Sequence, residues 1–194
     1  MTGKVEELLL SERKKSPLLF VLIDSEVSQI DSAVKLAKDV EQIGAASILV
    51  GGSSATDQME MAEVVKNLKS AVNIPIILFP GNITGVVPQA DAILFSSLMN
   101  SENPYYITQA QALGAPNVLK FGLEPLPTSY LVIGEGTSAW FVGNVRGIPF
   151  DKPKIAAAYS LAAQFFGCLL YTSPSPRDAT RARIPAREKK KKEG

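Results

Sequence analysis

The stretch ASILVGGSSATDQMEMAEVVKNLKSAVNIPIILFPGNITGVVPQADAILF, residues 46–95, decides the fold. It opens with a short apolar run, Ala46–Val50, which predicts a buried strand. The helical pattern of Asp57–Ala71 follows it, and two further apolar runs, Pro75–Phe79 and Ala92–Phe95, complete the stretch. The order strand, helix, strand, strand is typical of a parallel α/β sheet.

The connection between the last two runs is unusual. It spans only about a dozen residues, whereas a crossover between parallel strands usually takes a dozen or more and includes a helix. The connecting residues are rich in glycine and proline and show no helical period. We therefore expect an abbreviated crossover here, in which a short segment replaces the helix.

The same alternation continues on both sides of this stretch. Leu18–Ile23 is apolar throughout, which predicts a strand buried on both faces. The other expected elements are helices at Val5–Lys15, Ser28–Ile43, Pro104–Phe121 and Pro153–Phe166, strands at Ser129–Ile133 and Cys168–Tyr171, and a loop at Gly134–Pro149. This alternation predicts a doubly wound sheet or a (β/α)8 barrel. A barrel takes about 250 residues, so this chain would supply about five and a half of its eight units.

The chain changes character after Tyr171. Of its 20 basic and 19 acidic side chains, eight and three lie in residues 172–194, which leaves 12 and 16 in a mildly acidic body. The words YTSPSPRDATRARIP resemble a translated sequencing-library adaptor, and the segment has too few apolar residues to order itself. We expect a partial barrel domain at residues 1–171, cut off inside its fold, and a disordered basic tail of artefactual origin at 172–194.

Composition narrows the chemistry. The chain has no histidine, which removes imidazole catalysis and most zinc or haem sites. Its single cysteine, Cys168, excludes an internal disulfide, and the charged segment Met1–Lys15 is not a signal peptide. These features predict a cytoplasmic protein that works through carboxylates, hydroxyls, backbone amides, Lys or Arg, or a hard metal ion.

Polar and glycine residues stand where the predicted strands end. Asp24 follows the first strand, and Gly51-Gly52-Ser53 follow the second. In a barrel these positions lie at the catalytic end. An aspartate and a hydroxyl on neighbouring strand ends can hold a hard cation such as Mg²⁺, whose other ligands would be water and substrate phosphates. The alternative interpretation is a solvated aspartate beside a tight glycine turn.

A second group of residues is apolar and aromatic. Leu98, Met99, Tyr105 and Tyr106 follow the fourth predicted strand, and Trp140 follows the fifth. These side chains could line a groove for a long hydrocarbon. Residues of this kind also fill ordinary cores, and the pattern alone leaves both interpretations open.

The order of the words carries a family resemblance. LLFVLIDSE, ILVGGSSATDQ, IPIILFPGNITGVVPQADAILFSSLMNSENPYYITQAQALGA, GLEPLPTSYLVIGEGTSAWFVGNVRGIP and KPKIAAAYSLAAQFFG resemble the geranylgeranylglyceryl phosphate synthases of archaea over nearly all of residues 3–171. The resemblance implies a modified TIM barrel in which one outer helix is replaced. It also implies ether-bond formation between geranylgeranyl diphosphate and sn-glycerol 1-phosphate, with Mg²⁺ as cofactor.

The resemblance assigns individual residues. It implies that Asp24 and Ser53 are the Mg²⁺ ligands and that Tyr171 begins the family's word Tyr-x-Glu-x-Gly-Ser/Thr-Gly, which holds glycerol phosphate. This chain has Ser173 where that glutamate, the expected proton acceptor, should stand. Ser25-Glu26-Val27 also departs from the family's usual Pro-Asp-Lys or Pro-Asn-Lys. We therefore expect this chain to be inactive as written, and aggregation-prone or dependent on homo-oligomer contacts.

Three rival interpretations remain at this stage. One is a heptaprenylglyceryl phosphate synthase, which differs in prenyl length. Another is a barrel enzyme of sugar-phosphate or tryptophan metabolism, although the aromatic groove would be unnecessary there. The last is a non-catalytic binding protein with a basic tail. The family interpretation predicts no nucleic-acid partner, and membrane contact only through the lipid product.

Overall fold

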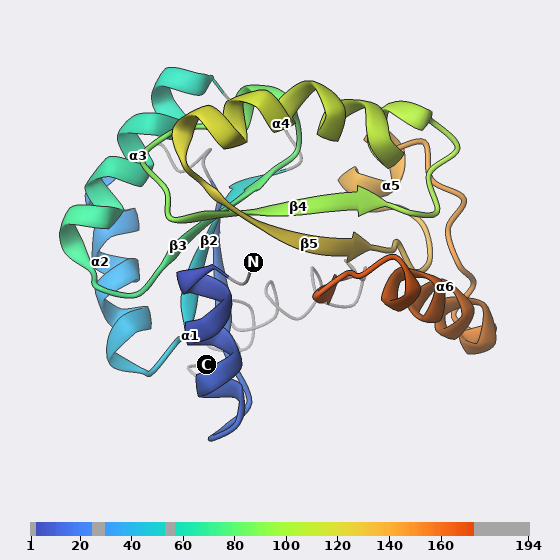
Figure 1. The fold of residues 1–194 in the computed structure, drawn as a ribbon, viewed down its shortest axis with the longest axis horizontal. Helices are drawn as coiled ribbons and strands as arrows, with labels where there is room; N and C mark the ends of the chain where they lie inside the picture. Colours follow the sequence, from blue (N-terminus) through green and yellow to red (C-terminus); the bar gives the residue numbers. More distant parts are fainter. Residues whose placement is uncertain (1–2, 25–29, 53–56, 173–194) are drawn as a thin grey trace, which may run out of the picture. The chain divides into compact units, whose positions relative to one another are not determined.

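The computed structural model describes residues 3–24, 30–52 and 57–172 (Figure 1). Its helices are α1 (Lys4–Arg13), α2 (Ile30–Gln42), α3 (Gln58–Ala71), α4 (Ala110–Phe121), α5 (Ser138–Val142) and α6 (Pro153–Phe165), with a 3-10 turn η1 (Ile83–Gly85) and a π-helical turn η2 (Tyr105–Gln109). Its strands are β1 (Phe20–Asp24), β2 (Ser47–Gly52), β3 (Ile76–Pro80), β4 (Ala92–Leu98), β5 (Glu124–Tyr130) and β6 (Leu170–Thr172). The predicted basic tail, from residue 173 on, lies outside the described residues.

The strands follow one another across the sheet in sequence order, β1-β2-β3-β4-β5-β6. The pairs β1–β2, β2–β3, β3–β4 and β5–β6 are parallel. A doubly wound sheet reverses its strand order at a switch point, whereas a barrel adds each strand beside the previous one. The described strands follow the barrel order. The predicted fold class is therefore confirmed: an α/β fold of the TIM-barrel type with six of the eight strands of a complete barrel.

The chain divides into two compact units. Unit 1 comprises residues 1–96 and 108–127, and unit 2 comprises residues 97–107 and 128–194. Strands β4 and β5 begin in unit 1 and end in unit 2.

The core of unit 1 lies between the sheet and its helices. Side chains alternate along each strand, so that one face of β1 to β4 packs against α2 and α3, which lie side by side (Figure 1). Their buried side chains form one apolar cluster, which includes Ile23, Ile48, Val50, Ile76, Leu78, Ile93, Ala33, Ala37, Val40, Val64, Val65 and Leu68.

Local signals set the helix ends in unit 1. The Asp57 carboxylate accepts hydrogen bonds from the N–H groups of Met59 (2.7 Å) and Glu60 (3.4 Å) and so caps α3. Gly44 ends α2 with a left-handed φ of 83°, a conformation that favours glycine.

The crossover between β3 and β4 contains only η1. The Asn82 side chain accepts a hydrogen bond from the N–H of Ile83 (2.7 Å) and so caps this single turn. The turn contacts both α3 and α4 and fills the place of a helix. The predicted abbreviated crossover is confirmed.

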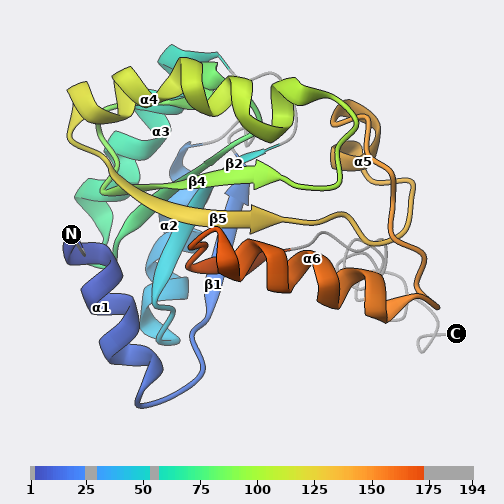
Figure 2. The same cartoon turned by 45° about the vertical axis from the view of Figure 1, so that its right-hand side comes forward.

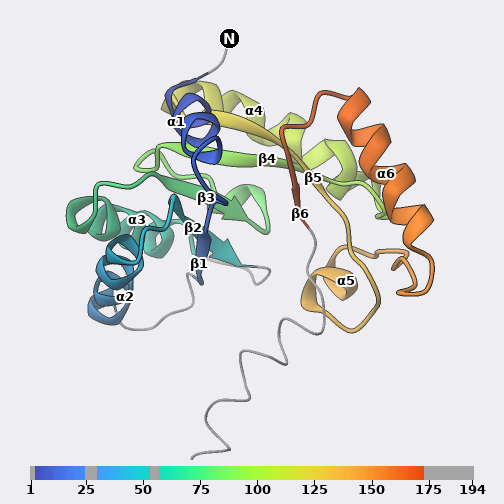
Figure 3. The same ribbon diagram turned by 90° about the horizontal axis from the view of Figure 1, so that it is seen from below.

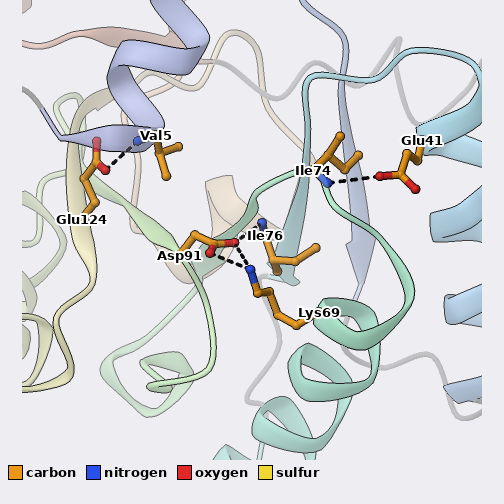
Figure 4. Close-up of polar contacts among 7 residues, drawn as sticks. All are labelled: Val5, Glu41, Lys69, Ile74, Ile76, Asp91 and Glu124. Carbon is orange, nitrogen blue, oxygen red and sulfur yellow. Dashed lines mark hydrogen bonds and ion pairs between the residues drawn. The ribbon is translucent and has the colours of Figure 1, made fainter.

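Three carboxylates accept hydrogen bonds from backbone N–H groups at the amino-terminal edge of the sheet in unit 1 (Figure 4). Asp91 pairs with Lys69 (2.6 Å) and accepts the N–H of Ile76 (2.8 Å), and Glu41 accepts the N–H of Ile74 (3.2 Å). The third carboxylate, Glu124, binds α1. In barrels this edge serves stability and the opposite edge serves function.

Helix α1 connects two distant strands of unit 1. Glu124, the first residue of β5, accepts the N–H groups of Val5 and Glu6, both at 2.8 Å, and α1 then leads into β1. Figure 2 shows α1 near the ends from which β4 and β5 start. Val5 and Leu9 are buried. Helix α1 therefore bridges the amino ends of β5 and β1.

Unit 2 holds the carboxyl ends of β4 and β5. Strand β6 pairs with β5, so that Ser129 lies opposite Tyr171 and Tyr130 opposite Thr172. Helix α6 precedes β6 and runs back along it (Figure 3). Among the described residues, no helix is both long and apolar enough to cross a membrane.

Two strand predictions need correction. The fifth strand runs over Glu124–Tyr130, not Ser129–Ile133. Pro125 and Pro127 argue against a strand by propensity, but both occupy exposed positions of the alternating pattern. The first strand is not buried on both faces. Leu22 is 48% exposed, since it points away from α2 and α3 on the first strand of the sheet.

The predicted loop Gly134–Pro149 contains the helix α5. Its single turn is capped by Thr137, whose hydroxyl accepts the N–H of Trp140 at 3.0 Å. A helix this short leaves no recognisable apolar period, which explains why the pattern favoured a loop. The helix matters for the site because it carries Trp140.

Candidate site at the carboxyl ends of the strands

Asp24 lies at the carboxyl end of β1 in unit 1. The register places it opposite Gly51 of β2, and Gly51 opposite Phe79 of β3. Asp24 is exposed and shares a sheet face with Leu22, because side chains two apart in a strand point the same way. The predicted metal-binding carboxylate therefore stands at the edge where barrels place their chemistry.

Gly51 has a structural requirement of its own. A side chain at this position would collide with the backbone carbonyl of Phe79 on the neighbouring strand. Both Gly51 and Gly52 belong to β2 rather than to the turn predicted after it. The glycine at position 51 is thus explained by strand packing.

The second predicted metal ligand, Ser53, lies outside the described residues, so the Asp24–Ser53 pair stays a prediction. In the described part of the chain no three His, Cys, Asp or Glu side chains gather to hold a metal ion. One exposed carboxylate suits Mg²⁺, which is commonly held by one or two carboxylates and completes its shell with water and substrate phosphates.

Other residues near the strand ends have structural tasks. Asn82 caps η1, as described above, and the Ser97 hydroxyl donates to the carbonyl of Ile107 (2.8 Å) in unit 2. Gly134 and Gly136 have left-handed φ values of 76° and 84°, which favour glycine. The residue types at these positions are explained by local hydrogen bonds and backbone geometry.

An aromatic cluster occupies the strand ends of unit 2. Leu98, Val132 and Val145 are buried, and Tyr106, Tyr130, Ala139 and Trp140 pack against them. Three of the five predicted groove residues, Leu98, Tyr106 and Trp140, therefore meet in one cluster. Tyr130, the last residue of β5, packs in the same cluster.

The other two predicted groove residues lie beside this cluster. Tyr105 packs edge-to-face on Tyr106, with ring centroids 5.1 Å apart. The Met99 sulfur accepts a hydrogen bond from the Ser129 hydroxyl at 3.0 Å. The cluster has the composition of a prenyl-binding wall, and its use as a groove stays a prediction.

Tyr130 and Tyr171 differ in environment. Burial raises the pKa of the Tyr130 phenol to about 12, so the phenol is neutral at physiological pH. Tyr171 is exposed in β6. Ser173, where the family's glutamate is expected, lies outside the described residues, so the role of Tyr171 in holding glycerol phosphate stays a prediction.

A polar centre beneath the cluster was missed by the sequence interpretation. The buried Asn100 side chain donates to the carbonyls of Val132 (2.9 Å) and Arg146 (3.0 Å), and it accepts the N–H of Val132 (3.1 Å). Ser101, also buried, donates its hydroxyl to the carbonyl of Gly143 at 2.6 Å. No local signal marked these two residues, because Ser96, Ser97 and Glu102 make the surrounding stretch polar as well.

These features define a class. The fold is a parallel α/β sheet in barrel order, with a carboxylate at the strand ends of unit 1 and an aromatic cluster at those of unit 2. Barrel proteins carry their functional residues at this edge of the sheet.

The comparisons identify the family. The PcrB family matches residues 10–176, and the chain belongs to it. Curated relatives named geranylgeranylglyceryl phosphate synthase include one from Nitrosopumilus maritimus, 78% identical over 166 residues (85% of this chain, 66% of the relative). Another, from Pyrococcus horikoshii, is 46% identical over 168 residues (87% of this chain, 66% of the relative). The family resemblance seen in the sequence is confirmed.

A solved structure extends the similarity to the fold. The (S)-3-O-geranylgeranylglyceryl phosphate synthase from Thermoplasma acidophilum, in complex with its substrate sn-glycerol-1-phosphate, has a TM-score of 0.83 and 32% identity. The alignment covers 90% of this chain and 70% of that one. The chain thus spans about two thirds of the length of the proteins it matches.

Proposed function

We propose that this protein belongs to a phosphoglycerol geranylgeranyltransferase of ether-lipid synthesis, acting in the cytoplasm. The reaction transfers the geranylgeranyl group from its diphosphate to the sn-3 hydroxyl of sn-glycerol 1-phosphate. The allylic C–O bond breaks, diphosphate leaves, a new C–O ether bond forms, and the hydroxyl loses its proton.

The similarity to named synthases carries this proposal. The relative from Nitrosopumilus maritimus is 78% identical over a segment that covers 85% of this chain. The glycerol phosphate complex of the Thermoplasma acidophilum protein supports the acceptor substrate. The aromatic cluster of unit 2 agrees with the donor, whose long hydrocarbon needs an apolar wall.

Asp24 and Ser53 would hold Mg²⁺ at the carboxyl ends of β1 and β2. When bound there, the ion would neutralise charge on the diphosphate leaving group. The exposed Asp24 carboxylate is a hard oxygen ligand of the kind this ion prefers. The register places Asp24 directly opposite Gly51 of β2, the strand that leads to Ser53.

The remaining residues of the site would bind and position substrate. Leu98, Tyr106 and Trp140 would exclude water from the prenyl chain, and the neutral Tyr130 phenol would add a polar edge to that wall. Positioning and charge stabilisation, without a covalent intermediate, would supply most of the rate acceleration. The proton acceptor would be the glutamate that the family carries where this chain has Ser173.

A chimera tests the proposed function. Residues 1–171 of this chain would be joined to the segment that follows the matched region of the Nitrosopumilus maritimus relative. We expect the chimera to form geranylgeranylglyceryl phosphate from geranylgeranyl diphosphate and labelled sn-glycerol 1-phosphate, detected by mass spectrometry. A folded chimera that makes no product, with farnesyl and heptaprenyl diphosphates tested beside the geranylgeranyl donor, would contradict the proposal.

A further inference from the structure

Three chain segments of unit 2 meet at Asn100 and Ser101. The first follows β4 and leads into η2, which carries Tyr106. The second, at residues 131–133, follows β5 and Tyr130, and the third, at residues 143–146, follows α5 and Trp140. Tyr106, Tyr130 and Trp140 of the aromatic cluster are therefore each only a few residues along the chain from this polar junction.

Hydrogen bonds join all three segments at that junction, which we call the Asn100 latch (the side chains of Asn100 and Ser101 with their partners). The Asn100 side chain binds the backbone of both Val132 and Arg146. The backbone carbonyl of Asn100 also accepts the N–H of Arg146 at 3.0 Å. The Ser101 hydroxyl binds the carbonyl of Gly143 and accepts the N–H of Asn103 at 3.0 Å.

We propose that Asn100 is a positioning residue, which fixes the separation of Tyr106 and Trp140 and thereby the prenyl chain that the cluster accepts. The proposal rests on the proposed function for its ligand. Its geometry stands on unit 2 alone, where Tyr106 and Trp140 both pack on Leu98, Val132 and Val145.

Asparagine suits this position because its side chain both donates and accepts. Its amide nitrogen donates to two carbonyls and its amide oxygen accepts one N–H. Aspartate has nearly the same shape but would place a carboxylate against the carbonyls of Val132 and Arg146, with no proton to donate. Since the site is buried, that loss cannot be made good by water.

The only tryptophan of the chain is Trp140, so its fluorescence reports directly on the cluster. We expect Asn100→Asp to shift the Trp140 emission to longer wavelength and to increase its quenching by acrylamide. Titration with geranylgeranyl diphosphate should show an affinity about tenfold weaker, because the loss of the two donated hydrogen bonds lets the cluster shift. Farnesyl diphosphate, whose shorter chain needs less of the wall, should lose less affinity than the longer donor.

The ratio of the two affinities separates positioning from general stability. Asn117→Asp, at an exposed site on α4, and Val65→Ala, in the core of unit 1, should leave that ratio and the emission unchanged. If Asn100→Asp fails to fold, Ser101→Ala removes only the hydroxyl bonds of the latch and should give the same changes in smaller measure.

Failure of the latch and failure of the proposed function give different results. Unchanged Trp140 emission and an unchanged affinity ratio in the folded Asn100 and Ser101 variants would overturn the latch. If the wild-type chain binds neither prenyl diphosphate, the proposed function loses its donor site. The latch would then be decided by the emission and quenching of Trp140, which need no ligand.

Discussion

Asp24 and Gly51 lie opposite each other on β1 and β2. We expect Asp24 to act in metal binding and Gly51 to act only in the packing of the sheet. Asp24 is an exposed carboxylate at the carboxyl end of β1, on the edge of the sheet where barrels place their chemistry. We expect Asp24→Ala to reduce turnover of the catalytic chimera nearly to background, and EDTA to silence the unmodified chimera until Mg²⁺ is restored. Asp39→Ala, on the exposed side of α2, is the control. Activity that survives both EDTA and Asp24→Ala would end the metal assignment.

Gly51 is expected to act through stability. Because a Cβ at this position would collide with the carbonyl of Phe79, Gly51→Ala should cost about 1–3 kcal/mol of unfolding free energy. Gly114, inside α4, is the matched control, since a Cβ there would meet only the Ile83 side chain at 3.9 Å. Gly114→Ala should stabilise the chain by about 0.5–1 kcal/mol. Urea denaturation measures both changes, and equal effects of the two substitutions would contradict the packing argument.

Tyr130 predicts a pH dependence of stability. Its folded pKa of about 12 lies above the ordinary value of 10.0, so folding favours the neutral phenol. Below pH 10 the Tyr130 phenol is neutral in both the folded and the unfolded chain, so it does not make the free energy of unfolding depend on pH. Between pH 10 and 12 the unfolded chain ionises first, and stability should fall by up to about 1.4 kcal/mol per pH unit. Urea denaturation from pH 9 to 11.5 should show a shallower decline for Tyr130→Phe, and identical slopes would argue against a buried phenol.

Among the elements, α1 owes its position to a residue more than a hundred positions away in the sequence. Glu124 satisfies two N–H groups in its first turn. Those groups have no partner within the helix, and a carboxylate also suits the positive end of the helix dipole. Glu124→Ala should cost about 1–2 kcal/mol and speed hydrogen exchange in α1. Glu63→Ala, exposed on α3, is the control. Unchanged exchange in α1 would show that the cap is unimportant.

Sequence patterns located most elements because their signals are local. The apolar run of β3 and the missing crossover helix each depend on neighbouring residues. The start of β5 was misplaced because Pro125 and Pro127 oppose a strand locally, while the sheet tolerates them at exposed positions. The Asn100 latch was missed for a related reason: its partners lie 32 and 46 residues away, and no local pattern encodes them.

At the scale of the whole molecule, the two edges of the sheet divide the work in the way that barrels do. Carboxylates at the amino edge, such as Asp91 and Glu124, bind backbone N–H groups and are used for stability. At the carboxyl edge stand Asp24 in unit 1 and the aromatic cluster in unit 2. The sequence could predict both groups because strand ends are recognisable. It could not show how the aromatic side chains pack, because that depends on contacts between distant segments.

This division predicts that binding and turnover separate in the 194-residue chain. The aromatic cluster is present within it, so prenyl diphosphates should bind and change the fluorescence of Trp140. Ser173 cannot replace a glutamate as proton acceptor, because a serine hydroxyl is not basic at neutral pH. We therefore expect prenyl diphosphate binding without ether formation in this chain, and both in the chimera. Fluorescence titration and product analysis on the same samples measure the two steps. Robust glycerol phosphate prenylation by the 194-residue chain would show that the glutamate is dispensable and that the acceptor site lies among residues assigned here to other tasks.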